Sequence, residues 1–269
     1  MIKSPLCIAV LLVVGIMSCN KKDVVYSSDT KIIGHGGMGI THDYPINTFE
    51  AIAFALHKGV DGVEIDVQMT IDSVLVAYHH EELEDEMEQT GSIYEKYWDE
   101  IRNEEYQELL YSEYGLVSLR DIFKHLPEYS DKTFFFDVKT FTTDTTGAYE
   151  RRMVRRLLNV IKEYQLSNTI VEVPSEFLGQ IVKSLMPEQR VFLYRNIEGI
   201  IDSCLKYEFQ GINQDIDQYS LEEVRLAQDN GLEVSCINTH SKDRNDEAYR
   251  LGIEYNQTDM VNYVLRKAR

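Results

Sequence analysis

The sequence is poor in cysteine, and its few cysteines form no metal or redox motif. Only four occur among 269 residues: Cys7, Cys19, Cys204 and Cys236. No two of them are spaced as CxxC, which excludes a thiolate zinc site and a thioredoxin-type redox motif. Cys204 and Cys236 fall on a predicted helix and a predicted strand, and we expect two buried thiols there rather than a disulfide.

Positively charged residues are also few. The chain carries 27 lysines and arginines against 45 aspartates and glutamates, which gives a formal net charge of −18. A protein this acidic is a poor candidate for binding nucleic acid or anionic lipid headgroups by charge. We therefore expect no nucleic acid partner, and any anionic substrate would need a cation to receive it.

Long apolar runs are absent after the N-terminus, where no segment reaches the roughly 18 residues that a membrane span needs. The stretch "MIKSPLCIAVLLVVGIMSCNKKD" has a charged start, a short apolar run and a polar continuation, which is typical of a secretory signal peptide. Its "IMSC" ending resembles the bacterial lipobox, in which the cysteine is lipidated. The sequence thus predicts a signal peptide over residues 1–18 and a lipid on Cys19. An ordinary signal peptide, or an anchor cleaved elsewhere or not at all, is the alternative.

This N-terminus predicts a protein attached to a membrane by a lipid anchor, in a bacterial cell envelope, on the periplasmic side or the cell surface. We interpret residues 19–30 as a flexible tether that packs against nothing, and residues 31–269 as one domain. Removal of the first 18 residues leaves 251 of the 269, about the length of a single eight-unit barrel. The oligomeric state is left open.

Short β-branched or aromatic runs alternate with amphipathic helical stretches through this domain. The predicted strands are Lys31–His35, Gly62–Asp66, Thr133–Lys139, Thr169–Val173, Arg190–Tyr194, Gly211–Gln214, Glu233–Ile237 and Glu254–Gln257. The helices that follow them begin at Thr48, Ser118, Thr145, Ser175, Glu198, Ser220, Asp243 and Asp259. Eight strand and helix pairs in strict alternation predict an α/β fold, a parallel (β/α)8 TIM barrel.

One segment after the second predicted strand breaks this alternation. Residues 67–79 continue the strand, turn at "TIDS" and return, which predicts a β-hairpin insertion rising from the top of the barrel. The acidic stretch 81–114 contains "EKYWDEIRNEEYQELLY" at helical spacing. We interpret it as a helical elaboration over the same face, with a solvated acidic helix as the alternative.

Carboxylates gather where two predicted strands end, and in such barrels the working residues lie at that face. Glu64 and Asp66 lie two residues apart on one face of an apolar strand, and Asp137 emerges from "TFFFDVK". Burying such charges is costly unless they are paired. Three carboxylates without a soft ligand suit magnesium, calcium or manganese rather than zinc. A buried ion pair between Asp137 and Lys139 is the competing interpretation.

Two histidine positions stand apart from the others. His35 ends the first predicted strand and is followed by Gly36 and Gly37, which let a ligand approach the backbone closely. The predicted hairpin returns His79 and His80 to the neighbourhood of the carboxylates. Because histidine titrates near neutrality, one on each side of a bound phosphate would serve as base and acid. Three other histidines are expected to be structural: His42, His57 and His125.

The stretch "GHGGMG", residues 34–39, matches the GxGxxG dinucleotide fingerprint directly after a strand. In that fold a helix opens at once, so that its N-terminus meets the pyrophosphate. Here "ITHDYPIN" intervenes, with Pro45 before the next predicted helix. A nucleotide-dependent oxidoreductase is therefore disfavoured.

Several motifs together resemble the glycerophosphodiester phosphodiesterase family. They are His35-Gly-Gly, "PINTFEAIAFALHKGVDGVEIDVQMTIDSVLVAYHH", "VSLRDIF", "FFFDVK", "GLEVSCIN" and "YNQTDM", from about residue 32 to residue 260. Members of the family are barrels that use a divalent ion to hydrolyse glycerophosphodiesters to glycerol 3-phosphate and an alcohol. The resemblance implies a small phosphodiester substrate and a Mg²⁺ or Ca²⁺ cofactor, with Mn²⁺ as a third candidate.

The resemblance also implies roles for single residues. The implied acid and base are His35 and His79, the implied metal ligands are Glu64, Asp66 and Asp137, and the implied phosphate contact is Lys139. From their positions we also expect Gly36, Gly37 and His80 to contact the substrate. The metal and proton-transfer groups of the family pattern are therefore present in this chain.

The sequence departs from the family pattern on the substrate side. The arginine after the first histidine is Gly36, the glutamate of PENT is Ile46, the aspartate after the second histidine is His80 and the aromatic of the late strand is Ile237. Two alternatives follow from these departures. One is a phosphodiesterase of different substrate specificity, and the other is a cation-dependent ligand-binding lipoprotein without catalytic activity.

Overall fold

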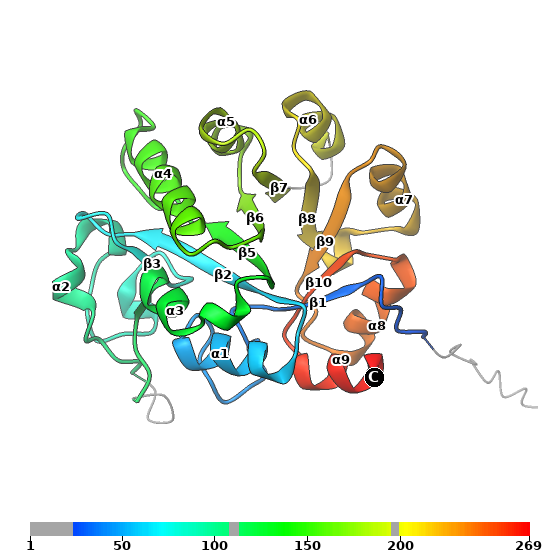
Figure 1. The fold of residues 1–269 in the computed structure, drawn as a ribbon, viewed down its shortest axis with the longest axis horizontal. Helices are drawn as coiled ribbons and strands as arrows, with labels where there is room; N and C mark the ends of the chain where they lie inside the picture. Colours follow the sequence, from blue (N-terminus) through cyan, green and yellow to red (C-terminus); the bar gives the residue numbers. More distant parts are fainter. Residues whose placement is uncertain (1–23, 108–112, 195–198) are drawn as a thin grey trace, which may run out of the picture.

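The computed structural model describes residues 24–107, 113–194 and 199–269, which form a closed barrel of parallel strands (Figure 1). The barrel strands are β1 (Lys31–Gly34), β2 (Gly62–Met69), β5 (Thr133–Val138), β6 (Asn168–Val173), β7 (Arg190–Tyr194), β8 (Gly211–Asp215), β9 (Glu233–Ile237) and β10 (Tyr255–Thr258). Each pairs with the next in this series, and β1 closes the ring by pairing with both β10 and β2. The predicted parallel (β/α)8 barrel is confirmed.

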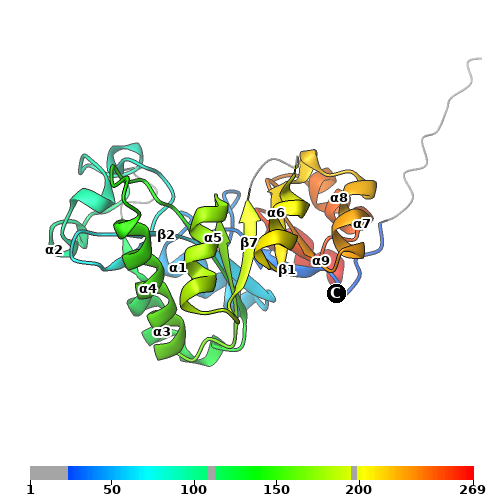
Figure 2. The ribbon, with the colours of Figure 1, turned by 90° about the horizontal axis from the view of Figure 1, so that it is seen from above.

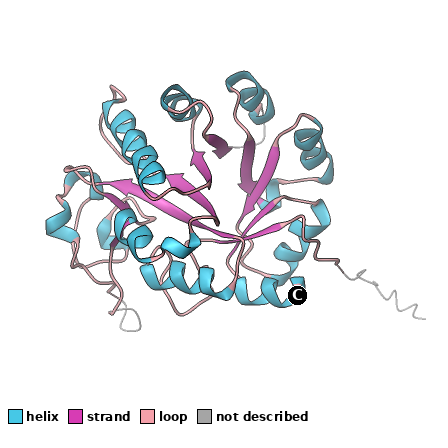
Figure 3. Ribbon diagram, in the orientation of Figure 1, coloured by secondary structure: helices cyan, strands magenta, loops and turns pink. Residues whose placement is uncertain are grey.

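Helices lie outside the strands and follow them in order (Figures 2 and 3). They are α1 (Phe49–Lys58), α3 (Leu119–His125), α4 (Ala148–Glu163), α5 (Glu176–Leu185), α6 (Ile200–Tyr207), α7 (Leu221–Asp229), α8 (Lys242–Leu251) and α9 (Val261–Ala268). Several begin where the sequence predicts because a hydroxyl group accepts a hydrogen bond from a backbone N–H of the first turn. Thr48, Ser118, Ser175 and Ser220 act in this way, and each such cap is worth about 1 kcal/mol.

The sequence "TFFFDV" of β5 contributes to both apolar layers of the barrel. Phe134 and Phe136 face outward and meet Phe123 of α3 edge to face. Phe135 faces the barrel interior, where it belongs to a buried cluster of side chains from five strands. Because successive side chains of a strand face opposite sides, Asp137 follows Phe135 on the interior face.

The interruption after β2 is a hairpin, as predicted. β2 extends beyond its pairing with β5 and pairs antiparallel with β3 (Leu75–Ala77), and β3 pairs in turn with β4 (Val117–Ser118). The turn is closed by Thr70, whose Oγ1 donates to Asp72 Oδ1 at 2.7 Å and accepts from the Val74 N–H at 3.0 Å. Directly after β3 the chain lies next to the barrel again at Tyr78, whose backbone N–H donates to the Asp66 carbonyl.

The predicted helical elaboration of the acidic stretch is wrong for its described part, residues 81–107. This part contains one short helix, α2 (Trp98–Ile101), and two 3₁₀ turns, Leu83–Asp85 and Ile93–Glu95. Its apolar side chains build a small core against the hairpin instead of a helix face: Val76, Tyr78, Leu83, Met87, Ile93, Ile101, Tyr106 and Leu116. Asp85, Glu86 and Tyr106 of this segment line one cavity together with His35 and His79.

The segment before β1 is packed on the domain. Tyr26 stacks on Tyr249 of α8 with ring centroids 3.9 Å apart, and its hydroxyl donates to Asp246 at 2.7 Å. The expected tether without packing is therefore wrong for residues 24–30. The predicted signal peptide and Cys19 lie outside the described residues. In the part of the chain that the structure describes, no helix is long and apolar enough to cross a membrane.

The two cysteines within the barrel are buried thiols, as expected. Cys204 lies in α6 and Cys236 in β9, and no disulfide joins them. Burial raises the pKa of the Cys236 thiol. Neither cysteine lies at the strand ends where the carboxylates gather.

Candidate active site

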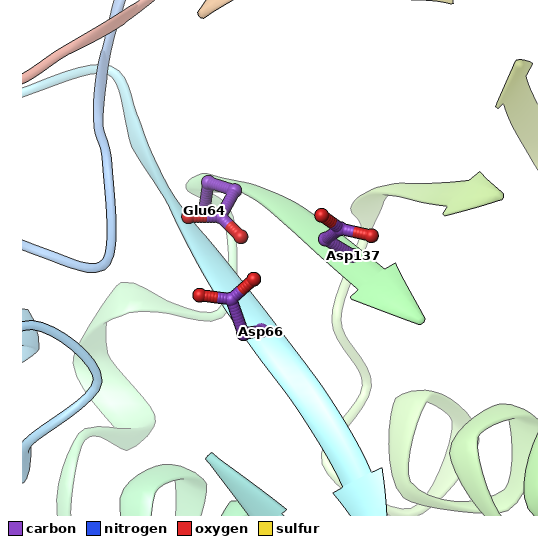
Figure 4. A group of neighbouring side chains, drawn as sticks. All are labelled: Glu64, Asp66 and Asp137. Carbon is purple, nitrogen blue, oxygen red and sulfur yellow. The ribbon is translucent and has the colours of Figure 1, made fainter. Parts of the chain in front are cut away.

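Three carboxylates converge on the neighbouring strands β2 and β5 (Figure 4). Glu64 and Asp66 come from β2 and Asp137 from β5, and each offers one oxygen within 4.8 Å of the others. The strand register sets this arrangement, because Asp66 pairs with Asp137 and Glu64 lies two residues earlier on the same face of β2. Glu64 and Asp66 are only 2% and 1% exposed.

The three carboxylates differ in proton affinity. Burial, together with the charge of Asp66, raises the pKa of Glu64 well above its usual range. Burial also raises the pKa of Asp137, although Lys139 opposes it. For Asp66 the effect of burial is outweighed by Lys139 and His79, so its pKa is lowered. The protein itself therefore favours the anion of Asp66, whereas burial disfavours the anions of Glu64 and Asp137, and a further positive charge would favour their ionisation.

Lys139 extends from the end of β5 into the cluster. Its Nζ lies 2.5 Å from Asp137 Oδ2 and 3.0 Å from Asp66 Oδ1. Burial lowers the pKa of Lys139, but the two carboxylates outweigh burial and raise it overall, so the amine stays charged. The competing interpretation of an Asp137–Lys139 ion pair is thus present in the structure, yet one amine faces three carboxylates.

The donor set fits a hard divalent cation. Glu64 Oε2 accepts the Gly36 N–H at 2.8 Å, whereas Glu64 Oε1 is buried without a hydrogen-bond partner. A buried carboxylate oxygen without a partner is costly. Carboxylate oxygens are the ligands that magnesium, calcium and manganese prefer. Glu64, Asp66 and Asp137 are therefore the residues that would hold such an ion.

His35 follows β1 directly and has a different partner at each ring nitrogen. Nε2 lies 4.0 Å from Glu64 Oε2, and Nδ1 lies 2.7 Å from Asp259 Oδ1. Burial lowers the pKa of His35, but the hydrogen bond with Asp259 and the charge of Glu64 outweigh burial and raise it to about 10. The surrounding carboxylates thus hold this imidazole as a cation.

His79 arrives from the hairpin on the same side of the barrel. The Gln68 side chain fixes the returning backbone by donating to the Tyr78 carbonyl at 3.0 Å and to the His80 carbonyl at 2.6 Å. Burial lowers the pKa of His79, and the charge of Asp66 opposes this only in part. His79 is therefore held neutral, in contrast to His35.

A cavity of about 620 Å³ brings the two histidines together. One part of its wall, from the β1–α1 loop, contains Ile40, Tyr44 and Ile46, and a second part, from the segment 81–107, contains Asp85, Glu86 and Tyr106. His80 lies beside this second part, with its ring nitrogens 3.8 Å from Asp85 and 3.5 Å from Glu86. His42, expected to be structural, also lines this cavity.

Gly36 and Gly37 are explained by the chain packed against them. Gly36 has φ +51°, and a Cβ there would lie 2.5 Å from Ile46 Cβ. Gly37 has φ +99°, and a Cβ there would collide with the backbone of Ala51 in α1. Their missing side chains thus allow the loop to pack on α1, and the predicted contact of these glycines with substrate stays a prediction.

Three residues to which the sequence analysis gave no role complete the site: Asn47, Gln68 and Asp259. Asn47 Nδ2 donates to Asp66 Oδ2 at 2.7 Å, and Asn47 Oδ1 accepts the Asp66 N–H at 3.0 Å. Asn47 and Asp259 belong to the motifs "PINT" and "QTDM", so the motifs carried a signal for them. No local pattern distinguishes Gln68 from other strand residues.

Fold and site together define the class of the protein, a TIM barrel with a candidate divalent-cation site and two histidines at the C-terminal ends of its strands. The model of the glycerophosphoryl diester phosphodiesterase family matches residues 38–262. The chain belongs to this family. His35 lies just before the matched stretch.

Individual relatives agree with this assignment. A glycerophosphodiester phosphodiesterase of Bacillus altitudinis is 36% identical over 90 residues, which cover 34% of this chain and 36% of the relative. A human glycerophosphodiester phosphodiesterase is 26% identical over 64% of this chain and 47% of its own length. The matches span between 36% and 56% of the curated relatives.

Solved structures show the same fold. A glycerophosphodiester phosphodiesterase from Parabacteroides distasonis has a TM-score of 0.76 at 20% identity, covering 88% of this chain and 96% of its own. An Oleispira antarctica phosphodiesterase, solved in complex with the product sn-glycerol-3-phosphate, has a TM-score of 0.78 at 16% identity, with coverages of 88% and 96%. At these identities the likeness concerns the fold alone.

Proposed function

We propose that the protein hydrolyses glycerophosphodiesters to glycerol 3-phosphate and an alcohol, and that the reaction depends on a divalent cation. One observation carries this proposal. The carboxylate cluster, with its unpartnered Glu64 oxygen, shares the strand ends with two histidines that line a single cavity. Family membership and the names of the relatives support the reaction class.

The proposed site has two kinds of group: those that supply positive charge and those that transfer protons. A bound Mg²⁺, Ca²⁺ or Mn²⁺ supplies positive charge to the phosphoryl oxygens. Lys139 adds a second positive charge beside Asp66 and Asp137. His35 and His79 exchange protons with the attacking and leaving oxygens, a role that histidine fills at neutral pH. The cavity between them is the space for the two ester groups.

The residues on the substrate side of the site support a second candidate function, a phosphodiesterase of different substrate specificity. The resemblance places a family arginine at Gly36 and a family glutamate at Ile46. These two positions touch, since a Cβ on Gly36 would lie 2.5 Å from Ile46 Cβ. Two charged positions of the family pattern are thus replaced together by an apolar contact beside the cavity.

The test is a hydrolysis assay of the purified protein. Glycerophosphocholine, glycerophosphoethanolamine and glycerophosphoglycerol are each incubated with Mg²⁺, Ca²⁺ or Mn²⁺, or with EDTA, and glycerol 3-phosphate is measured. We expect release of glycerol 3-phosphate with metal and none with EDTA. The Glu64→Gln variant, which keeps the shape of the side chain, is the matched control and should need more metal. Cleavage of no diester under any metal would contradict the proposal and favour a ligand-binding lipoprotein.

We further propose that Cys19 carries a lipid that attaches the protein to a membrane of the bacterial cell envelope. The support is the N-terminal pattern of a signal peptide ending in "IMSC". A single acyl chain anchors weakly, whereas several chains anchor firmly. In fractionated cells, the Cys19→Ala protein should leave the membrane fraction and keep its activity. Finding it still in the membrane fraction would remove the lipid-anchor proposal.

A further inference from the structure

We propose that Asp259 is a positioning residue that fixes the orientation of His35 and keeps a hydrogen on its Nδ1, whether the ring is charged or neutral. The proposal rests on the proposed proton-transfer role of His35 and adds the residue through which that role is maintained. Asp259 Oδ1 lies 2.7 Å from His35 Nδ1. The other ring nitrogen, Nε2, lies toward Glu64 Oε2 at 4.0 Å, so one nitrogen is occupied and the other faces the site.

The Asp259 carboxylate is itself held in place. Asp259 is 1% exposed and follows β10 directly. Its Oδ1 accepts the Ile40 N–H at 3.2 Å, and its backbone carbonyl accepts the hydroxyl of Thr41. The backbone N–H of His35 donates to the Thr258 carbonyl at 3.2 Å. Pairing of the first and last barrel strands therefore brings the side chains of His35 and Asp259 together.

The chemistry of a carboxylate decides the tautomer. An ionised carboxylate only accepts hydrogen bonds, so His35 Nδ1 must carry a hydrogen, and proton exchange with substrate is left to Nε2. A neutral amide can donate as well as accept, and would allow the hydrogen to move to Nε2. Asp259 is not one of the three clustered carboxylates, so its loss should leave the cation site in place.

The main test compares Asp259→Asn with the wild type in kcat, KM and the metal concentration for half-maximal activity. We expect kcat to fall about 10²-fold, with KM and metal requirement within about twofold. The matched control is Thr41→Val, which removes the hydrogen bond to the Asp259 backbone and keeps the carboxylate; its kcat should stay within about twofold of wild type. Unchanged kcat in Asp259→Asn, or a change in KM alone, would overturn the proposal.

A double-mutant cycle separates positioning from structural support. If Asp259 acts through His35, adding Asp259→Asn to His35→Ala should cause no further loss of kcat. If the fold-loss of kcat in the double variant equals the product of the losses in the two single variants, the proposal is contradicted.

A second measurement does not depend on the variant folding or on turnover. ¹⁵N NMR of the wild-type histidines, assigned with His35→Ala and followed to the pH at which the His35 ring becomes neutral, should show that the remaining hydrogen stays on Nδ1. Hydrogen on Nε2 alone would overturn the proposal. This result stands apart from the hydrolysis assay, so failure of the proposed function is distinguishable from failure of the positioning role.

Discussion

The strand side of the site, Glu64, Asp66 and Asp137 on β2 and β5, keeps the carboxylates of the family pattern, whereas the loop side, residues 36–46 and 79–107, replaces several of its groups. The strand side is fixed by backbone pairing, with Asp66 opposite Asp137. The loop side is fixed by contacts within the loop, where the Asn47 N–H donates to the Gly36 carbonyl at 2.9 Å and Ile46 leaves no room for a side chain on Gly36. We therefore expect cation binding to depend on the barrel strands and substrate choice to depend on the loops.

The largest effect on kcat should come from substitution of His35 or His79, which both line the cavity. His35→Ala and His79→Ala should each lower kcat by on the order of 10² to 10⁴, because each removes proton transfer from a site that still holds its carboxylates. Raising the metal concentration should not restore either variant. The measurement is kcat as a function of metal, and recovery at high metal would show that the histidine serves cation binding instead.

His80→Ala is the internal control for these histidines. His80 pairs with Asp85 and Glu86 at the cavity wall, and such partly exposed pairs are worth little. We expect its kcat to stay within about tenfold of wild type. If His80 proved indispensable and His79 replaceable, the register through "YHH" would be displaced by one residue, which reverses the face of a strand.

A smaller and metal-dependent effect is expected on the strand side. Asp137→Asn removes one carboxylate charge from the cluster, so half-maximal activity should need at least about tenfold more metal. Saturating metal should recover most of the activity, unlike for the histidine variants. Asp99→Asn, a change at an exposed acid, should leave the metal titration unchanged. A defect in Asp137→Asn that metal does not reduce would remove Asp137 from the set of ligands.

A stability measurement tests the packing of the loop side. Gly36→Ala introduces a Cβ at φ +51° against Ile46, whereas Gly231→Ala introduces one at φ +78° with nothing within 4 Å. Both variants carry backbone strain, but only the first carries a collision. In denaturant unfolding, Gly36→Ala should lose about 1–3 kcal/mol more than Gly231→Ala. Equal losses in the free energy of unfolding would show that the loop accommodates the Cβ without loss of stability.

The smallest effect concerns pH in the metal-free protein. The pKa of Glu64 is raised in the folded state well above its ordinary value of 4.5. Its contribution to stability is therefore fully present below pH 4.5 and is lost as pH rises through the folded pKa. The Glu64→Gln variant does not titrate, so in EDTA it should melt about 2–4 °C above wild type at pH 7 and equally below pH 4.5. Saturating metal should reverse the order at pH 7, and a difference independent of pH would contradict this account.

Much of the fold follows from local sequence. Seven of the eight predicted strands agree with the observed ones within one residue at each end, and β2 runs three residues beyond its predicted end at Asp66, into the hairpin. Thr48, Ser118, Ser175 and Ser220 cap helices where expected. Both signals are local, since strand alternation and capping involve neighbouring residues. The helical prediction for the stretch 81–114 failed in its described part because its apolar residues meet Val76 and Tyr78 of the hairpin, a partner that helical spacing does not reveal.

The candidate site was foreseeable only in part. Glu64, Asp66, Asp137 and the two histidines stand at predicted strand ends, where barrel geometry gathers side chains. The motifs carried a signal for Asn47 and Asp259 but not for the groups that they contact, because Asn47 meets Asp66 across 19 residues and Asp259 meets His35 across 224. Tyr26 likewise reaches Asp246 across 220 residues, which is why the expected tether without packing failed.

The sequence by itself determined the alternation of strands and helices and the types of group at the strand ends, because hydrophobic period, caps and motifs are written in adjacent residues. Only the tertiary structure decided which carboxylate lacks a partner, which nitrogen of His35 is occupied and which loop residues touch. These depend on closure of the barrel, where β10 pairs with β1 and brings Asp259 to His35. Burial then turns such contacts into large shifts in proton affinity, and burial is a property of the folded chain.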